Sequence, residues 1–285
     1  MAGPGNTPKN HHFVPQLLQR QWADENGQVQ AWKWQNGCIV PFRTTPQNIM
    51  SETHLYRAEH IDQPGLYEAA FSGLESAAAA VLAKFRDPAK LTLTQDNYEV
   101  WASFLLAQRV RVPAMVASAK QKVIARFTSI FDEHDPDFEL FKREDRFSTP
   151  LRYIEEYHPN VLANFHLDTL LKMAADPKHV QKVCRMKWFV GRGYSRKIIL
   201  GDDPIMLDGD LRGDACLIGL PISPTEIFFA ASNDALRERI ARGSTDDIAV
   251  RMNEVQARQA QRFVIGDVMP RFLERRLRKP PSGAT

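Results

Sequence analysis

The chain has 285 residues, of which 44% are hydrophobic and 25% are charged. This composition is typical of an ordinary globular protein and argues against a disordered chain. The formal net charge of +3 is too small to indicate a dedicated DNA-binding domain. The longest near-apolar run, residues 74–83, is much shorter than a membrane span, which needs roughly 20 apolar residues.

The amino terminus and the cysteines bear on the cellular compartment. Residues 1–10 are polar and have no apolar core segment, so we expect a flexible tail and no signal peptide. Cys38, Cys184 and Cys216 are far apart and form no C-x-x-C pair, which argues against a zinc knuckle or a disulfide framework. Free thiols are typical of a reducing compartment, so we expect a cytoplasmic protein without a membrane partner.

The first predicted elements are a short helix and a β-hairpin. Residues 13–23 have the apolar spacing of a helix. Residues 29–34 alternate as a half-buried strand does, and residues 38–42 return as a second strand. Asn36-Gly37 supplies the turn, because both residues tolerate positive φ, and Pro41 marks the second strand as an edge strand.

A helical part is predicted over about residues 64–175. One of its helices begins at Thr94 or Asp96, either of which can cap an amino terminus. Pro113 interrupts that helix, because proline lacks the amide hydrogen that a helix interior needs. Residues 132–150 are charged and contain two prolines, so they predict a loop or a boundary between subdomains.

The hydrophobic pattern changes after the helical part. A small, mostly antiparallel sheet is predicted over about residues 183–231, from short apolar segments at residues 184–190, 197–200, 217–220 and 226–230. A capping pattern then starts a last helix, expected at about 245–278, and residues 280–285 are expected to be a disordered tail. The sequence therefore predicts an α+β fold, mostly helical, with an N-terminal β-hairpin and a small antiparallel sheet in the C-terminal half. We expect residues 11–279 to form a single domain.

Two adjacent imidazoles begin the most distinctive motif, His-His-Phe-Val-Pro. An unperturbed imidazole titrates near neutral pH, so His11 or His12 could serve as a general base or a metal ligand. The other interpretation is that both are polar residues at the start of an element, where one of them satisfies a backbone amide.

Gln108, Arg109 and Arg111 lie together on a predicted helix, and we interpret them as substrate-binding residues. Gln108 and Arg111 share a face, whereas Arg109 is turned away, because successive helical residues are rotated by about 100°. A buried arginine needs an anion, which can be the phosphate or carboxylate of a substrate. The alternative is a structural salt bridge from Arg109 to Glu75 or Asp203.

Asp202 and Asp203 come directly after a predicted strand. The end of a strand holds a carboxylate rigidly, which suits a catalytic acid or base. We therefore place Asp203 with His11 and His12 as the candidate catalytic residues. The alternative is that Asp203 forms an Asx-type turn in front of Pro204.

The His-His-x-Val-Pro string is also similar to the first strand of the HNH nucleases, in which a histidine next to the metal activates water. That resemblance implies a divalent metal as cofactor, with His12, Asn48 and His54 as ligands, and Asp203 is a fourth candidate ligand. The chain departs from the nuclease pattern at three points. The gap between His12 and Asn48 is long, no Gly-Gly follows the proline, and the zinc-knuckle cysteines are absent from the sequence.

Six short motifs occur in an order that resembles the bacterial family called domain of unknown function 4238. The similarity covers roughly residues 9–266, and the motifs lie at residues 11–16, 108–113, 201–204, 220–224, 252–256 and 260–264. The family usually shows Ser-Asp-x-Pro where this chain has Gly201-Asp202-Asp203-Pro204, so residue 201 offers no hydroxyl. The resemblance implies no established activity, but it places His11, His12, Gln108, Arg109 and Asp203 at motif positions.

Two functions are compatible with these residues. The first is a nuclease-like hydrolase that acts on a phosphodiester, such as nucleic acid, or on another anionic substrate. Its base or metal ligand would be a histidine, and Arg109 would hold the substrate's charge. The second is a non-enzymatic binding or interaction module, in which the same polar residues form a buried structural network. We favour the enzyme, because His, Arg, Gln and Asp are costly to bury and are common in active sites. It requires the imidazoles, Arg109 and Asp203 to share one open cavity.

Overall fold

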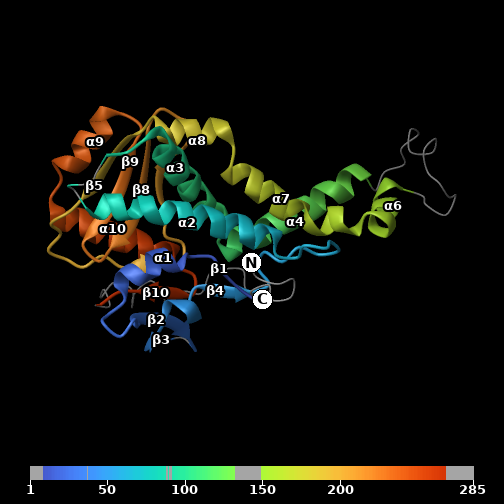
Figure 1. The fold of residues 1–285 in the computed structure, drawn as a ribbon, viewed down its shortest axis with the longest axis horizontal. Coiled ribbons are helices and arrows are strands. Elements are labelled where there is room, and N and C mark those ends of the chain that lie inside the picture. Colours follow the sequence, from blue (N-terminus) through green and yellow to red (C-terminus); the bar gives the residue numbers. More distant parts are fainter. Residues whose placement is uncertain (1–8, 37, 88, 90–91, 132–148, 268–285) are drawn as a thin grey trace.

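The computed structural model describes residues 9–36, 38–87, 89, 92–131 and 149–267. Its amino-terminal part combines a two-stranded sheet with a β-hairpin (Figure 1). Strand β1 (Asn10–His12) pairs antiparallel with β4 (Ser51–Thr53). The elements between these two strands are α1 (Gln16–Gln19), η1 (Arg20–Trp22), β2 (Val29–Gln35), β3 (Cys38–Thr44) and η2 (Pro46–Asn48).

The predicted hairpin is confirmed. Strands β2 and β3 pair antiparallel, and Asn36 has a φ of 52°, the positive value that the predicted turn requires. Strand β3 lies at the edge of its sheet, as Pro41 indicates. In place of one helix over residues 13–23, the chain forms the short helix α1, which begins directly after Pro15, and then the 3-10 turn η1.

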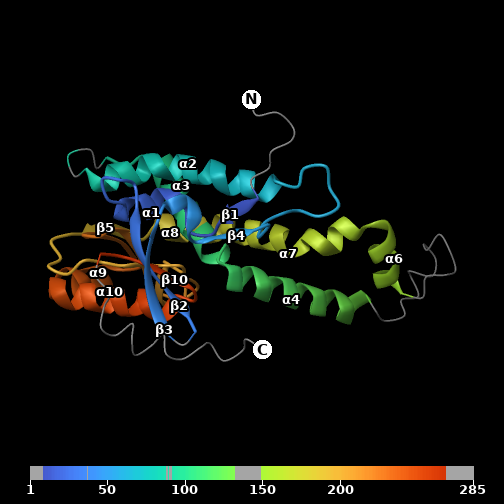
Figure 2. The same ribbon diagram turned by 90° about the horizontal axis from the view of Figure 1, so that it is seen from below.

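Helices form the middle of the chain. They are α2 (Leu66–Arg86), α3 (Gln95–Val110), α4 (Pro113–Phe131), α6 (Pro150–Tyr157), α7 (Pro159–Ala174) and α8 (Pro177–Cys184). Thr94 caps α3 in a capping box with Asn97, and Pro113 begins a separate helix, as predicted. Helices α4, α6 and α7 together project from the rest of the molecule as an arm (Figure 2). Residues 132–148, most of the predicted loop, lie outside the described residues.

The predicted antiparallel sheet of the C-terminal half has the strand order β5-β9-β8-β7. Its strands are β5 (Lys187–Gly191), β7 (Met206–Gly209), β8 (Cys216–Ser223) and β9 (Glu226–Ala231). Both faces of this sheet are covered. Phe228 packs against Trp101 of α3, with 5.6 Å between ring centroids, and Phe229 clusters with Met252 on the opposite face. Every residue of β8 is therefore buried. The mostly helical α+β fold is confirmed.

Two predictions for the C-terminal half are wrong. The strand predicted at residues 197–200 is β6 (Leu200–Gly201), and it belongs to a different sheet, with the order β3-β2-β10-β6. The helix predicted over about 245–278 is α10 (Thr245–Gln259), which ends at residue 259 and is followed by strand β10 (Phe263–Ile265). Residues 268–278 lie outside the described residues. Helix α9 (Asp234–Ala241) precedes α10 and is capped by the Asn233 side chain, which accepts the Leu236 amide.

A buried carboxylate explains why α10 ends where it does. Asp202 accepts hydrogen bonds from the backbone amides of Gln261, Arg262 and Phe263, at 2.7, 2.7 and 3.0 Å. These bonds hold the chain in a turn after α10 and direct it into β10. The β-branched pair Val264-Ile265 then pairs between β2 and β6. The sequence pattern around residue 260 is still helical, so this tertiary contact overrides it.

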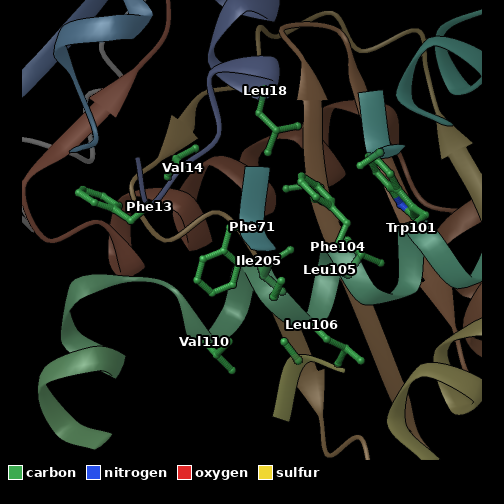
Figure 3. Close-up of a cluster of buried hydrophobic side chains, with 14 of the residues drawn as sticks. Phe13, Val14, Leu18, Phe71, Trp101, Phe104, Leu105, Leu106, Val110 and Ile205 are labelled. Carbon is green, nitrogen blue, oxygen red and sulfur yellow. The ribbon is translucent and has the colours of Figure 1, made fainter. Parts of the chain in front are cut away.

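The largest hydrophobic cluster joins parts of the chain that are distant in sequence. Figure 3 shows Phe13, Val14 and Leu18 from the amino-terminal segment gathered with Phe104 and other side chains of α3. The segment that carries the two histidines is thus anchored by its neighbours in the core. Among the described helices, none is long and apolar enough to cross a membrane.

Candidate functional site

The last turn of α3 sends its polar side chains to two different places. Gln108 and Arg111 face the amino-terminal strand, where the Gln108 Nε2 donates to the Phe13 carbonyl at 2.6 Å and Arg111 Nη2 donates to the His12 carbonyl. Arg109, between them in sequence, is turned away, as the helical period predicts. The QRxRxP motif therefore contributes to two environments.

The first environment is a buried polar group that we call the junction cluster, made of His11, His12, Tyr56, Glu75 and Arg111. Arg111 is only 2% exposed, and its Nη1 lies 2.6 Å from Glu75 Oε1. Its guanidinium stacks over the Phe71 ring, 4.9 Å from the centroid, and its backbone carbonyl accepts a bond from the Tyr56 hydroxyl. The salt bridge to Glu75 that the sequence allows for Arg109 is made by Arg111.

The two imidazoles of the junction cluster bind backbone. His11 Nδ1 accepts the Tyr56 amide at 2.8 Å, and the two rings stack with their centroids 5.6 Å apart. His12 Nε2 lies 3.0 Å from the Pro46 carbonyl, to which it can only donate. Burial lowers the pKa of His12, so its imidazole is neutral at pH 7. Both contacts tie β1 to the segment around β4.

A second carboxylate of α2 faces the same guanidinium. Glu68 and Glu75 are separated by two helical turns and lie on one face. Burial raises the pKa of Glu68 to about 7, although Arg111 acts in the opposite direction. Its Oε2 is buried and has no hydrogen-bond partner among the described residues. Arg111 thus pairs with Glu75 and leaves Glu68 poorly compensated.

The second environment begins at the strand end that carries the two aspartates. Helix α10 holds this strand by side-chain amides. Gln256 accepts the Gly201 amide and donates to the Pro204 carbonyl, both at 2.9 Å. A Cβ at Gly201 would lie 2.7 Å from the Gln256 backbone oxygen, so helix and strand approach too closely for any other residue without a shift. The Asp202 carboxylate is used by the three amides of the turn after α10. Asp203, the next residue, lies at the wall of a pocket.

Asp203 and Arg109 line one open pocket of about 530 Å³. Its walls come from the end of α3, the start of α4, the end of α7, α8, β7 with the residues after it, and the end of α10. The residues that line it are Leu106, Arg109, Val110, Met115, Met173, His179, Asp203, Ile205, Leu207, Asp210, Leu211, Arg212 and Gln259. We call it the Arg109–Asp203 pocket.

Two arginines and two aspartates, Asp203 and Asp210, bring opposite charges into this pocket. Burial and the negative charge of Asp202 together raise the pKa of Asp203 to about 6, whereas Gln259 and Arg109 act in the opposite direction. No carboxylate among the described residues lies within ion-pair distance of Arg109. Gln259 Nε2 donates to the Ile205 carbonyl at 2.9 Å and so fixes the segment next to Asp203. The pocket thus presents the Arg109 guanidinium, which has no ion-pair partner among the described residues, together with a carboxyl group whose pKa is about 6.

The chain matches one protein-family model over most of its length. The model described as "Protein of unknown function (DUF4238)" matches residues 10–268. The chain belongs to this family. The resemblance inferred from the motifs is therefore confirmed over most of the chain, and the match includes both the junction cluster and the pocket. No curated protein and no solved structure matches the chain.

The structure divides the candidate residues of this DUF4238 chain between the two environments. His11, His12, Gln108 and Arg111 lie at or beside the junction cluster, and none of them lines the pocket. The single shared cavity expected from the sequence is therefore not found. The physical reason is that Gln108 and Arg111 share one face of α3 and hold β1 there, whereas Arg109 projects from another face.

The four candidate metal ligands do not meet. His12 faces the Pro46 carbonyl, the Asn48 amide donates to the Thr45 hydroxyl at 3.2 Å, and Asp203 lines the pocket. His54 is exposed, at a backbone position with a φ of 60°. Nowhere in the described part of the chain do three or more His, Cys, Asp or Glu residues come together as metal ligands would. These residues do not fit the HNH-type metal site, and we derive no step through a metal.

Sequence reasoning missed Tyr56, Glu68 and Gln259. No short motif marks Tyr56, whose contacts depend on the pairing of β1 with β4. Glu68 could have been found, because its spacing of seven from Glu75 places both carboxylates on one face of a helix. Gln259 is the last residue of α10. The sequence predicted that this helix continues to about residue 278, so Gln259 was not recognised as lying at a helix end.

Proposed function

We propose that this protein is a hydrolase that binds a small anionic substrate in the Arg109–Asp203 pocket. Arg109 holds the negative charge of the substrate, and Asp203 is the general acid–base. The supporting observation is the contrast at the end of α3, where Gln108 and Arg111 have protein partners and Arg109 has no ion-pair partner among the described residues. An uncommitted, partly buried guanidinium in a pocket is the arrangement that receives a phosphate or carboxylate.

The pocket supports one sequence of proton transfers. Asp203, ionised at pH 7, takes a proton from a water molecule, and the water oxygen attacks the phosphorus or carbonyl carbon of an ester. The bond to the leaving oxygen breaks, and Asp203 returns the proton to that oxygen. Arg109 offsets the charge that develops during the attack. A pKa of about 6 suits this role, because an acid–base catalyst works best when its pKa is near the working pH.

The junction cluster takes the structural role that the alternative interpretation describes. Its imidazoles and guanidinium hydrogen-bond to backbone carbonyls and amides, and its cation is paired. Within our proposal it is a positioning element, because it fixes the end of α3 from which Arg109 extends. A histidine therefore has no catalytic role in the proposed reaction.

The proposal includes a cytoplasmic location. Cys38, Cys184 and Cys216 are all free, and Cys216 is buried. Unpaired cysteines are common in reducing compartments and are rare in secreted proteins of this size.

Hydrolysis of bis(para-nitrophenyl) phosphate by the full chain tests the proposal. We expect Asp203→Asn to lower kcat/KM by about 10²–10⁴-fold, the usual contribution of a general acid–base, while leaving the melting temperature nearly unchanged. Arg109→Gln should lower kcat/KM by at least about tenfold. Matched controls are Asp62→Asn and Arg152→Gln, both at exposed positions far from the pocket lining. Equal turnover by the wild type and Asp203→Asn would contradict the proposal.

A further inference from the structure

Aliphatic side chains form one wall of the Arg109–Asp203 pocket. Leu106 and Val110 from α3 and Ile205 belong to the main hydrophobic core, in which Figure 3 labels them, and they also line the pocket. Leu207 and Leu211 continue this surface. An aliphatic wall of this size offers burial to an alkyl group, because apolar area removed from water is stabilising.

Two methionines with exposed side chains also line the pocket. Met115 begins α4 and is 38% exposed, and Met173 ends α7 and is 49% exposed. Both therefore sit where the arm meets the rest of the molecule (Figure 2). Methionine side chains are flexible and polarisable, and they adapt to apolar ligands of irregular shape. Both methionines therefore add flexible apolar surface to the lining of the pocket.

The polar part of the lining consists of two arginines, two aspartates (Asp203 and Asp210), His179 and Gln259. Arg109 and Arg212 are the two arginines of the lining, and His179 is held at 3.0 Å by Asp176. None of the described lining residues is Phe, Tyr or Trp. A nucleic-acid strand needs a track of several cations and aromatic rings on which its bases stack. The described lining offers neither feature, whereas it does offer a cation beside an aliphatic wall.

We infer that the substrate is a small anion that carries an aliphatic chain, and not a polynucleotide. The inference rests on the proposed function and specifies its substrate. The anionic head binds at Arg109, next to Asp203, and the chain lies along Leu106, Val110 and Leu207 towards the two methionines. The pocket volume of about 530 Å³ is within the range that small-molecule ligands occupy.

Titration calorimetry with a series of alkyl phosphates tests this inference. The full-length protein is titrated with ethyl, butyl, hexyl and octyl phosphate, and separately with a single-stranded oligothymidine. We expect the Kd to fall about fourfold for each buried methylene, until the chain fills the pocket. Arg109→Gln should weaken binding of every alkyl phosphate by at least about tenfold.

Two variants separate the aliphatic wall from the head-group site. Leu207→Gln should flatten the dependence on chain length, and Met173→Gln should weaken octyl phosphate while leaving ethyl phosphate unchanged. Met173 is exposed, so we expect Met173→Gln to fold like the wild type, and a change in its binding then reports on the pocket. Leu66→Gln is the matched control, because Leu66 is also exposed, at 46%, and does not line the pocket.

The outcomes distinguish the two proposals. Binding that depends on Arg109 but not on chain length would overturn the aliphatic substrate and leave the proposed function standing. Tighter binding of oligothymidine than of octyl phosphate would also overturn the aliphatic substrate. Failure of every anion to bind, or binding unaffected by Arg109→Gln, would overturn the proposed function itself.

Discussion

Arg109 and Arg111 are two positions apart on the chain, yet their surroundings are opposite. Arg111 is buried, paired with Glu75 and bonded to the amino-terminal strand, whereas Arg109 faces a pocket without an ion-pair partner among the described residues. The comparison teaches that neighbouring residues of one polar motif can face different environments, one a buried ion pair and the other a pocket. The two arginines differ in whether their polar atoms have partners within the protein. The sequence motif alone does not show this difference.

The largest effect on stability should come from Arg111→Met. Removal of one partner of a buried ion pair leaves the other carboxylate without its counter-charge, which typically costs about 3–5 kcal/mol. Glu75 keeps some contact with water, so we expect a value near the lower end of that range. Urea unfolding measures it, with Arg152→Met as the control at an exposed position. If Arg111→Met lowered the free energy of unfolding by less than about 1 kcal/mol, Arg111 would not have the structural role that distinguishes it from Arg109.

Gln108→Ala should have the next largest effect. The variant removes a fully buried amide and leaves the Phe13 carbonyl without its donor, which costs about 1–3 kcal/mol. Phosphodiester turnover by the folded protein should stay close to the wild-type value, because Gln108 does not line the pocket. A variant with full stability and no turnover would assign Gln108 to the pocket instead of the junction.

Glu68→Gln should change stability in a manner that depends on pH. The folded-state pKa of Glu68, about 7, is raised above its unfolded value, so wild-type stability is lost as pH rises towards and through 7. The neutral amide avoids this loss. At pH 8.5 we expect the variant to be more stable, by on the order of 1 kcal/mol after solvent screening, and near pH 4 the two should be equal. Urea unfolding at the two pH values checks the sign, and equal stability at both would contradict the assignment.

Arg109→Gln should have the smallest effect on folding, within about 0.5 kcal/mol, because it breaks no ion pair with any described residue. It should instead move the pH profile of turnover. Asp203 must be ionised to act as a base, so kcat/KM should rise with pH through about 6 in the wild type. Arg109 lowers the pKa of Asp203, so its removal should shift that rise to higher pH. An unchanged midpoint would show that the two side chains do not interact.

Local chemistry made much of the fold predictable. Asn36 in the hairpin turn, Thr94 as a helix cap and Pro113 as an interruption act through their own backbone preferences, so their positions were correct. The pairing of β10 with β2 and β6 could not be predicted in this way. It depends on three amides that meet the Asp202 carboxylate across about sixty positions of sequence, and no short window contains both partners.

The candidate site, like the fold, was predictable in its local features and not in its long-range contacts. The motifs selected the polar residues, and the helical period correctly turned Arg109 away from Gln108 and Arg111. The assembly of these residues was wrong, because it assumed that costly polar groups converge on one cavity. Here the imidazoles satisfy backbone atoms of neighbouring strands, and such contacts become visible only when β1 is placed beside β4.

The missing side chain at position 201 has a consequence for the shape of the pocket. Helix α10 rests on β6 at a separation set by Gly201, whose absent Cβ would lie 2.7 Å from the Gln256 carbonyl oxygen. The same helix carries Gln259, which reaches the carbonyl of Ile205. A serine at this position, as the family motif usually has, would bring its Cβ against that oxygen unless the helix and the strand moved apart. The close approach that sets Gln259 beside Ile205 is therefore one that a glycine at position 201 permits.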